Sequence, residues 1–172
     1  IDKAKSAGGE DYQAARYEGF GPDGSTIIVD CLTDNVNRTV SEVKNCFTKT
    51  KCKMGVSGSV EHGYQHLSHI SIKGMDEEEV LETLLMADIE ILDISEEDEI
   101  VEIEAEGYDQ DNIEAALLEA NDAIEIVESE RGWYPLNFVE LDEENMALFD
   151  KFTALIDEVE DVQEYYHNIK ED

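Results

Sequence analysis

The stretch EIVEIEAEG, residues 99–107, decides the fold class, because apolar and acidic side chains alternate from Val101 to Glu106. Such alternation with a period of two is typical of a β-strand that has one buried face and one solvated face. The apolar set is Val101, Ile103 and Ala105, and the acidic set is Glu102, Glu104 and Glu106. The stretch therefore predicts a sheet that is covered on one side only.

The segments on either side of this strand predict a complete α+β unit. In chain order they are a strand at 70–72, a helix at 75–88, a strand at 89–94, the strand at 99–107, a helix at 109–122 and a strand at 123–129. The order β-α-β-β-α-β is the ferredoxin-like pattern, also called the α-β plait. We expect residues 69–131 to form one domain.

The rest of the chain predicts a second copy of the same pattern. The expected elements are a strand at 25–32, a helix at 38–50 and a strand at 58–67, then a strand at 133–141, a helix at 142–157 and a strand at 162–169. A further short strand is expected within 12–21. The fold class is α+β, with two ferredoxin-like domains, the second inserted into the first. The first domain would comprise 10–68 plus 132–172, and residues 1–9 would be a remnant of a preceding domain or linker.

Composition excludes several classes of protein. With 172 residues, 41% of them hydrophobic, the chain can bury a core. No apolar run approaches the roughly 20 residues of a membrane helix, so no membrane partner is expected. The cysteines are odd in number and form no C-x-x-C pair: Cys31, Cys46 and Cys52. A reducing compartment is therefore expected, the cytoplasm or, for a eukaryotic source, the mitochondrial matrix.

The net charge of −32 is confined to one half of the chain. Residues 1–75 hold 9 Lys and Arg against 9 Asp and Glu, whereas residues 76–172 hold 3 against 35. A surface so negative repels phosphate backbones over a Debye length of about 8–10 Å. Nucleic acid would therefore bind through the first half or through a preceding part. The acidic half is either a solvated surface or a site for a basic protein.

Motifs for catalysis, cofactors and metals are weak. Residues 19–24, GFGPDG, match G-x-G-x-x-G, but a strand is expected after them, where a dinucleotide site needs a helix N-terminus. Pro22, Asp23 and Gly24 are ordinary turn residues. The histidines near Cys52 lack the paired spacing of a zinc site: His62, His66 and His69. We expect no cofactor, no metal and no enzymatic activity.

Five basic residues and one acid, Glu42, fall within residues 38–53. The basic ones are Arg38, Lys44, Lys49, Lys51 and Lys53. At 100° per residue, Arg38 and Lys49 share the helix face opposite Val40 and Phe47. Such a patch suits phosphates or an acidic protein, and the alternative is a solvated helix face. It has no interleaved aromatics, so stacking on single strands is not indicated.

The segment TDNVNRT, residues 33–39, carries polar side chains that could be metal ligands, catalytic groups, a docking loop or a helix cap. Thr39 and Glu42 fit the S/T-x-x-E capping box, in which each side chain binds a free amide of the first turn. Asp34 and Asn35 would then turn the chain out of the preceding strand. This interpretation leaves the arginine of the segment pointing outward.

Three segments, in this order, resemble the YebC/PmpR family: RYEGFGPDGSTIIVDCLTDNVNRTVSEVKNCF at 16–47, GVSGSVEHGY at 55–64 and DVQEYYHNI at 161–169. Its members are described as probable transcriptional regulatory proteins, and its mitochondrial relative as a translational activator of cytochrome oxidase. The resemblance implies an N-terminal helical domain, most of which this chain lacks, followed by two α+β domains, one interrupting the other. It implies neither an enzyme nor a cofactor.

Three hypotheses for function follow. The first is a regulator of gene expression that binds DNA, or alternatively ribosomal RNA as a ribosome-associated translation factor, through residues 38–53 and the missing N-terminal domain. The second is an acidic module that holds a basic protein through residues 76–172. The third, a hydrolase, rests only on the abundance of carboxylates.

Overall fold

The structure is a computed structural model that describes residues 11–171. It divides into two compact units: the first runs to Tyr64 and resumes at Pro135, and the second spans Gln65–Tyr134. The second unit is thus an insertion in the first. The expected domain boundaries, 68/69 and 131/132, lie within four residues of these divisions. The expected remnant at residues 1–9 lies outside the described residues.

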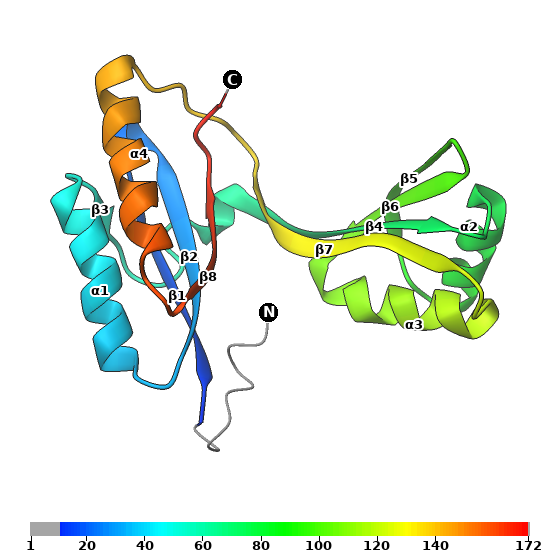
Figure 1. The fold of residues 1–172 in the computed structure, drawn as a ribbon. Helices are drawn as coiled ribbons and strands as arrows, with labels where there is room; N and C mark the ends of the chain where they lie inside the picture. Colours follow the sequence, from blue (N-terminus) through cyan, green and yellow to red (C-terminus); the bar gives the residue numbers. More distant parts are fainter. Residues whose placement is uncertain (1–10, 172) are drawn as a thin grey trace. The chain divides into compact units, whose positions relative to one another are not determined.

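The second unit has the ferredoxin-like topology that the sequence predicts (Figure 1). Its elements are β4 (Tyr64–Lys73), α2 (Glu77–Met86), β5 (Ile91–Glu97), β6 (Ile100–Glu106), α3 (Gln110–Ala120) and β7 (Glu125–Pro135). The strand order β5-β6-β4-β7 places the first and third strands in the centre. The apolar set of β6, Val101, Ile103 and Ala105, is buried as predicted. It packs with Val80 and Leu84 of α2 and Ile113 and Leu117 of α3 in one core.

The first unit reaches a similar sheet by another route. Its elements are β1 (Gln13–Phe20), η2 (Pro22–Gly24), β2 (Thr26–Thr33), α1 (Val36–Lys49), β3 (Lys53–Met54), α4 (Glu143–Asp157) and β8 (Val162–His167). The strand order is β3-β1-β2-β8. In the ferredoxin-like pattern the segment 133–141 would be the strand that pairs with β2 on the side away from β8. That place is taken by β1, which pairs with β2 over eight residue pairs. The prediction of a sheet strand at 133–141 is therefore wrong.

The hairpin of β1 and β2 has a physical advantage over that predicted pairing. The turn at Pro22–Gly24 closes it locally, and Gly24 adopts a φ of 78° that suits glycine. A short loop costs less closure entropy than bringing together strands far apart in sequence. The first three residues of the segment 133–141 instead form the end of β7, at Pro135. Further along, Val139 forms an isolated bridge with Ile169.

The predicted strand at 58–67 is also wrong for its first six residues, because residues 55–63 form a loop on the sheet. A Cβ on Gly19 would meet the Phe47 ring of α1, so the neighbouring Glu18 points to the face away from α1. There the Glu18 carboxylate accepts hydrogen bonds from three amides of the loop. The loop ends in a 3₁₀ turn, η3 (Glu61–Gly63), and only then does the chain enter β4.

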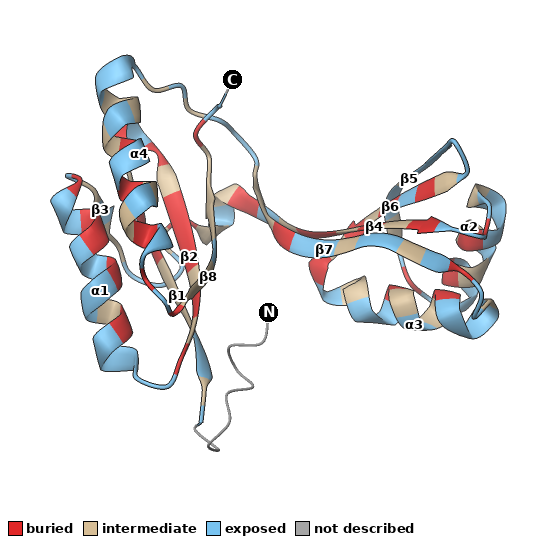
Figure 2. Cartoon of the chain, viewed as in Figure 1, coloured by how far each residue is buried: buried red, intermediate tan, exposed pale blue. Residues whose placement is uncertain are grey.

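The helices α1 and α4 cover the other face of the first sheet, as the buried residues in Figure 2 show. The helix α4 buries one stripe of side chains at spacings of three and four, Phe149, Phe152 and Ile156. The Phe47 ring of α1 meets Phe152 edge to face, with centroids 4.9 Å apart. This packing holds the second half of α1, where Val43, Cys46 and Phe47 are buried, and therefore positions the lysines on that half.

Candidate nucleic-acid interface

The helix α1 begins at Val36, earlier than the capping prediction requires. Asn35 is the N-cap, and its Oδ1 accepts a hydrogen bond of 3.1 Å from the Arg38 amide. The predicted capping box of Thr39 and Glu42 is therefore wrong. Thr39 lies within the helix and is buried, where it has no free amide to cap. Asn35 was expected only to turn the chain. It caps the helix because it stands directly before the first helical residue, where its side-chain oxygen can accept a hydrogen bond from a first-turn amide.

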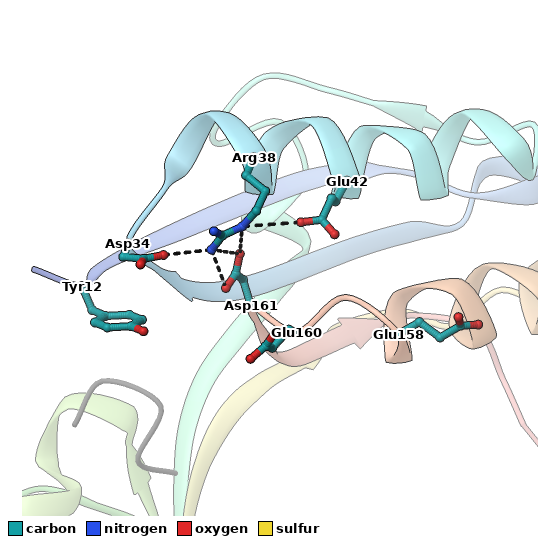
Figure 3. A pocket seen from close by; sticks show the side chains of 7 residues that line it. All are labelled: Tyr12, Asp34, Arg38, Glu42, Glu158, Glu160 and Asp161. Atoms are coloured by element: carbon teal, nitrogen blue, oxygen red, sulfur yellow. Dashed lines mark hydrogen bonds and ion pairs between the residues drawn. The ribbon is translucent and has the colours of Figure 1, made fainter. Parts of the chain in front are cut away.

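Arg38 is held by carboxylates of its own unit (Figure 3). Its Nη2 lies 2.9 Å from Asp34 Oδ1 and 2.9 Å from Asp161 Oδ2. Its Nε lies 3.7 Å from Glu42, one turn further along α1. The hydrogen bonds to Asp161 and Asp34 raise the pKa of the guanidinium. Arg38 thus joins the start of α1 to the start of β8, and the expectation that it points freely outward is wrong.

Asp161 is the centre of this network. It is 7% exposed, and the Thr39 hydroxyl lies 2.8 Å from its Oδ2. Burial by itself raises the pKa of a carboxylate, but the hydrogen bonds from Thr39 and Arg38 outweigh it, so the pKa of Asp161 lies below its ordinary value. The adjacent pocket of about 370 Å³ is lined by five carboxylates and by Tyr12 and Arg38. Such a pocket does not attract a phosphate.

The remaining basic residues of 38–53 are exposed and lie on the second half of α1 and in the residues that follow it. They are Lys44 and Lys49 on α1, Lys51 in the turn that follows, and Lys53 on β3. Among residues 11–171 none of the four forms an ion pair, whereas Arg38 forms three. We call these four residues the lysine surface. Their ammonium groups are available to an external anion.

The loop 55–61 follows the lysine surface directly and is held by one buried carboxylate. Glu18 is 1% exposed, and it accepts hydrogen bonds of 2.8, 3.0 and 2.9 Å from the amides of Gly58, Val60 and Glu61. Burial alone raises the pKa of Glu18, but these three bonds outweigh it, so its pKa lies below the ordinary value. The carbonyl of Glu18 also accepts from the Gly55 amide. The loop is therefore anchored at both ends.

The other candidate residues do not converge on a site. His66 stacks on Trp133, His69 bonds Tyr134 and Glu104, and His62 lies in the exposed turn η3. No group of three or more His, Cys, Asp or Glu side chains in the described part of the chain is arranged to hold a metal ion. The segment GFGPDG is followed by the strand β2, as predicted, and not by the helix N-terminus that a dinucleotide site needs. Within residues 11–171, no helix is long and apolar enough to cross a bilayer.

Charge separates the two units. The second unit holds 23 Asp and Glu against two basic residues, Lys73 and Arg131. No Lys, Arg or His falls within residues 74–130. The second unit is thus an unfavourable surface for phosphate, and the lysine surface belongs wholly to the first unit.

Sequence patterns do not single out the two carboxylates that hold this region together, Glu18 and Asp161. Each is one acid among 44, and no spacing relates Asp161 to the segment 33–39 that it binds. A weak signal existed for Glu18, because an acid stands between Tyr17 and Gly19 in a segment that predicts a strand. Burial of both side chains follows from sheet pairing, which only the tertiary structure supplies.

Comparison with known proteins places the chain in a family. The family described as TACO1/YebC second and third domain matches residues 12–169. A probable transcriptional regulatory protein of Marinomonas sp. (strain MWYL1) is 46% identical over 168 residues, covering 98% of this chain and 71% of that protein. One of Alteromonas mediterranea is 43% identical over 168 residues, covering 98% and 70%.

A solved structure agrees with these relatives. The crystal structure of a conserved hypothetical protein from Aquifex aeolicus aligns with a TM-score of 0.66 at 28% identity, covering 96% of this chain and 68% of that one. The match of the family to residues 12–169, together with identities above 40% across almost the whole chain, shows that this chain belongs to the TACO1/YebC family, whose curated relatives are named probable transcriptional regulatory proteins.

Proposed function

We propose that the chain is part of a non-enzymatic regulator of gene expression that binds DNA, and that the lysine surface contacts the phosphate backbone. The observation that carries the proposal is that four exposed lysines without ion pairs lie within ten residues of a chain whose net charge is −32. Elsewhere in the described part of the chain, acids far outnumber bases. Names of the relatives support a role in regulation.

The lysine surface suits backbone contact and not the reading of sequence. A lysine ammonium binds phosphate as a point charge, and contacts to phosphate position a protein on a duplex without identifying bases. The acidic second unit repels the same backbone, so the charge asymmetry restricts the orientations in which the protein approaches nucleic acid. Sequence preference would have to come from other residues.

A binding assay with salt variation tests the proposal. The affinity of the chain for a duplex of about 30 base pairs is measured by fluorescence anisotropy at several salt concentrations. Each phosphate contact adds about 0.9 to the slope of log K against log salt, so four add about 3.6. Replacing Lys44, Lys49, Lys51 and Lys53 by Gln should weaken binding and reduce the slope by about that amount.

The matched control replaces four exposed basic residues outside the lysine surface by Gln: Lys73, Arg131, Lys151 and Lys170. This variant should retain the affinity and the slope of the original chain. The proposal is refuted if the chain does not bind the duplex, or if both variants lose affinity equally.

Ribosomal RNA is the second candidate target, as for a ribosome-associated translation factor. The supporting observation is that all four cations of the surface are lysines, whose contact with phosphate does not distinguish RNA from DNA. Co-sedimentation with ribosomes, with and without nuclease treatment, separates the two targets. Ribosome binding that is lost in the four-lysine variant, with no duplex binding, would favour this second candidate.

A further inference from the structure

A shallow groove runs between the two helices of the second unit. It has a volume of about 440 Å³ and is lined by Thr83, Met86 and Ala87 from α2 and by Ala116, Glu119 and Ala120 from α3. Each set has the spacing i, i+3, i+4, so each forms one stripe along its helix. The alanine side chains are small, so they leave open space between the two helices.

The groove includes one apolar side chain that is unusually exposed for its type. Met86 is 90% exposed, although methionine is among the residue types most often buried. Methionine side chains are flexible and polarizable, and they are common on surfaces that adapt to partner helices. A groove between two helices with an exposed apolar side chain is the kind of surface that receives the apolar face of an amphipathic helix.

The charge around the groove selects the occupant. Residues 74–130, which include both helices, contain 23 acids and no Lys, Arg or His. The acids on the two helices are Glu77, Glu78, Glu79, Glu82, Asp111, Glu114 and Glu119. No cation of this segment can neutralise them, so an acidic or phosphate-bearing ligand is repelled and a cationic one is attracted.

We propose that the groove between α2 and α3 binds a basic amphipathic helix of a protein partner. The apolar face of that helix would lie on Met86 and the alanines, and its lysines or arginines would meet the acids of both walls. This interaction is independent of the lysine surface, which lies in the first unit. It gives the acidic half a specific partner class in addition to its solvated surface.

The test uses a fluorescent probe peptide of about 16 residues, with Leu at spacings of three and four and Lys on the flanking positions. A second peptide has the same composition in an order that removes the apolar face. The chain should bind the first probe at least tenfold more tightly than the second. Replacement of Met86 and Ala120 by Gln should weaken binding of the first probe at least tenfold.

The matched control replaces Leu85 and Ala115 by Gln, exposed neighbours on the same two helices that do not line the groove. This control should bind the first probe as the original chain does, and circular dichroism should show all variants folded. Equal binding of both probes would overturn the proposal, because charge alone would then explain it. Equal loss of probe binding in both variants would overturn it too. Self-association of the chain that the Met86→Gln and Ala120→Gln changes abolish would also overturn it, because a second copy of the chain would then occupy the groove.

Discussion

Replacing Glu18 by Gln should release the loop 55–61 from the sheet while leaving the shape of the side chain almost unchanged. In the original chain, Oε1 accepts from the amides of Val60 and Glu61, and Oε2 accepts from the amide of Gly58. A Gln side chain offers one carbonyl oxygen for the first two amides. Its NH₂ group would face the third amide, so the Gly58 N–H would lose its partner.

The magnitude follows from these three bonds. A hydrogen bond to a charged group contributes about 1.5–3 kcal/mol and a neutral one about 1, so the two surviving bonds lose roughly 2 kcal/mol together. The unpaired Gly58 amide costs about 1–3 kcal/mol more. Against this, the neutral Gln avoids the cost of burying a carboxylate, which removes about 1–2 kcal/mol of the loss. The net destabilisation of the loop spans about 1–4 kcal/mol, and we expect the middle of that range, about 2–3 kcal/mol.

Amide hydrogen exchange measured by NMR is the suitable assay, because the two units can unfold separately and a whole-chain transition would mix them. A loss of 2–3 kcal/mol predicts that the amides of Gly58, Val60 and Glu61 exchange roughly 30- to 150-fold faster in the Gln variant. The control is Glu164→Gln, an exposed acid on β8. It should leave the three exchange rates unchanged.

The pH dependence gives a second check on Glu18. Its pKa is lower in the folded protein than in the unfolded chain, so its contribution is fully present above about pH 4.3 and is lost as the pH falls through the folded pKa. The difference between the original chain and the Gln variant should therefore shrink in acid. Exchange rates of the three amides within threefold of the original at pH 7 would refute the reasoning.

Three further predictions concern the first unit. Asp161→Asn should lower its stability by about 2 kcal/mol at pH 7, measured by exchange in β8, because Arg38 and Thr39 lose a charged acceptor. The loss should fade below about pH 4, since the folded pKa of Asp161 is depressed, and an effect equal at pH 7 and pH 3 would contradict this. Phe152→Ala should cost about 3–5 kcal/mol in urea unfolding, and a cost below 1 would show that the core refills the cavity. Gly19→Ala should cost about 1–3 kcal/mol, because its Cβ would lie 2.7 Å from the Lys53 carbonyl oxygen, and thermal unfolding at the original midpoint would disprove the clash.

The second unit shows how far sequence patterns reach. Its six elements are local, and each carries its own period: two along β6 and three to four along α2 and α3. Alternation along residues 101–106 determines which side chains are buried, because a one-residue shift in register would expose Val101, Ile103 and Ala105. Helix and strand order then leaves few ways to cover one face of a sheet. The ferredoxin-like topology could therefore be predicted from the order and periodicity of the segments alone.

The first unit shows where those patterns fail. The segment 58–67 has strand-like residues, yet its first part crosses the sheet as a loop because Glu18 supplies acceptors there for its amides. Nothing in the local sequence distinguishes an amide that pairs with a strand from one that pairs with a buried carboxylate. The place beside β2 that was expected for residues 133–141 is occupied by β1. Local sequence does not predict this either, because which strands pair depends on competition among all the strands of the chain.

The sequence by itself determined the α+β class, the insertion of one unit in the other, and the separation of charge between the halves, because composition and periodicity are properties of neighbouring residues. The tertiary structure alone decided which basic residues are available to a partner. Arg38 and Lys49 looked equivalent on one helix face, yet Asp161, 123 residues further along the chain, neutralises Arg38 and leaves Lys49 exposed. An ion pair depends on distance in space, and the fold brings Asp161 within 2.9 Å of Arg38.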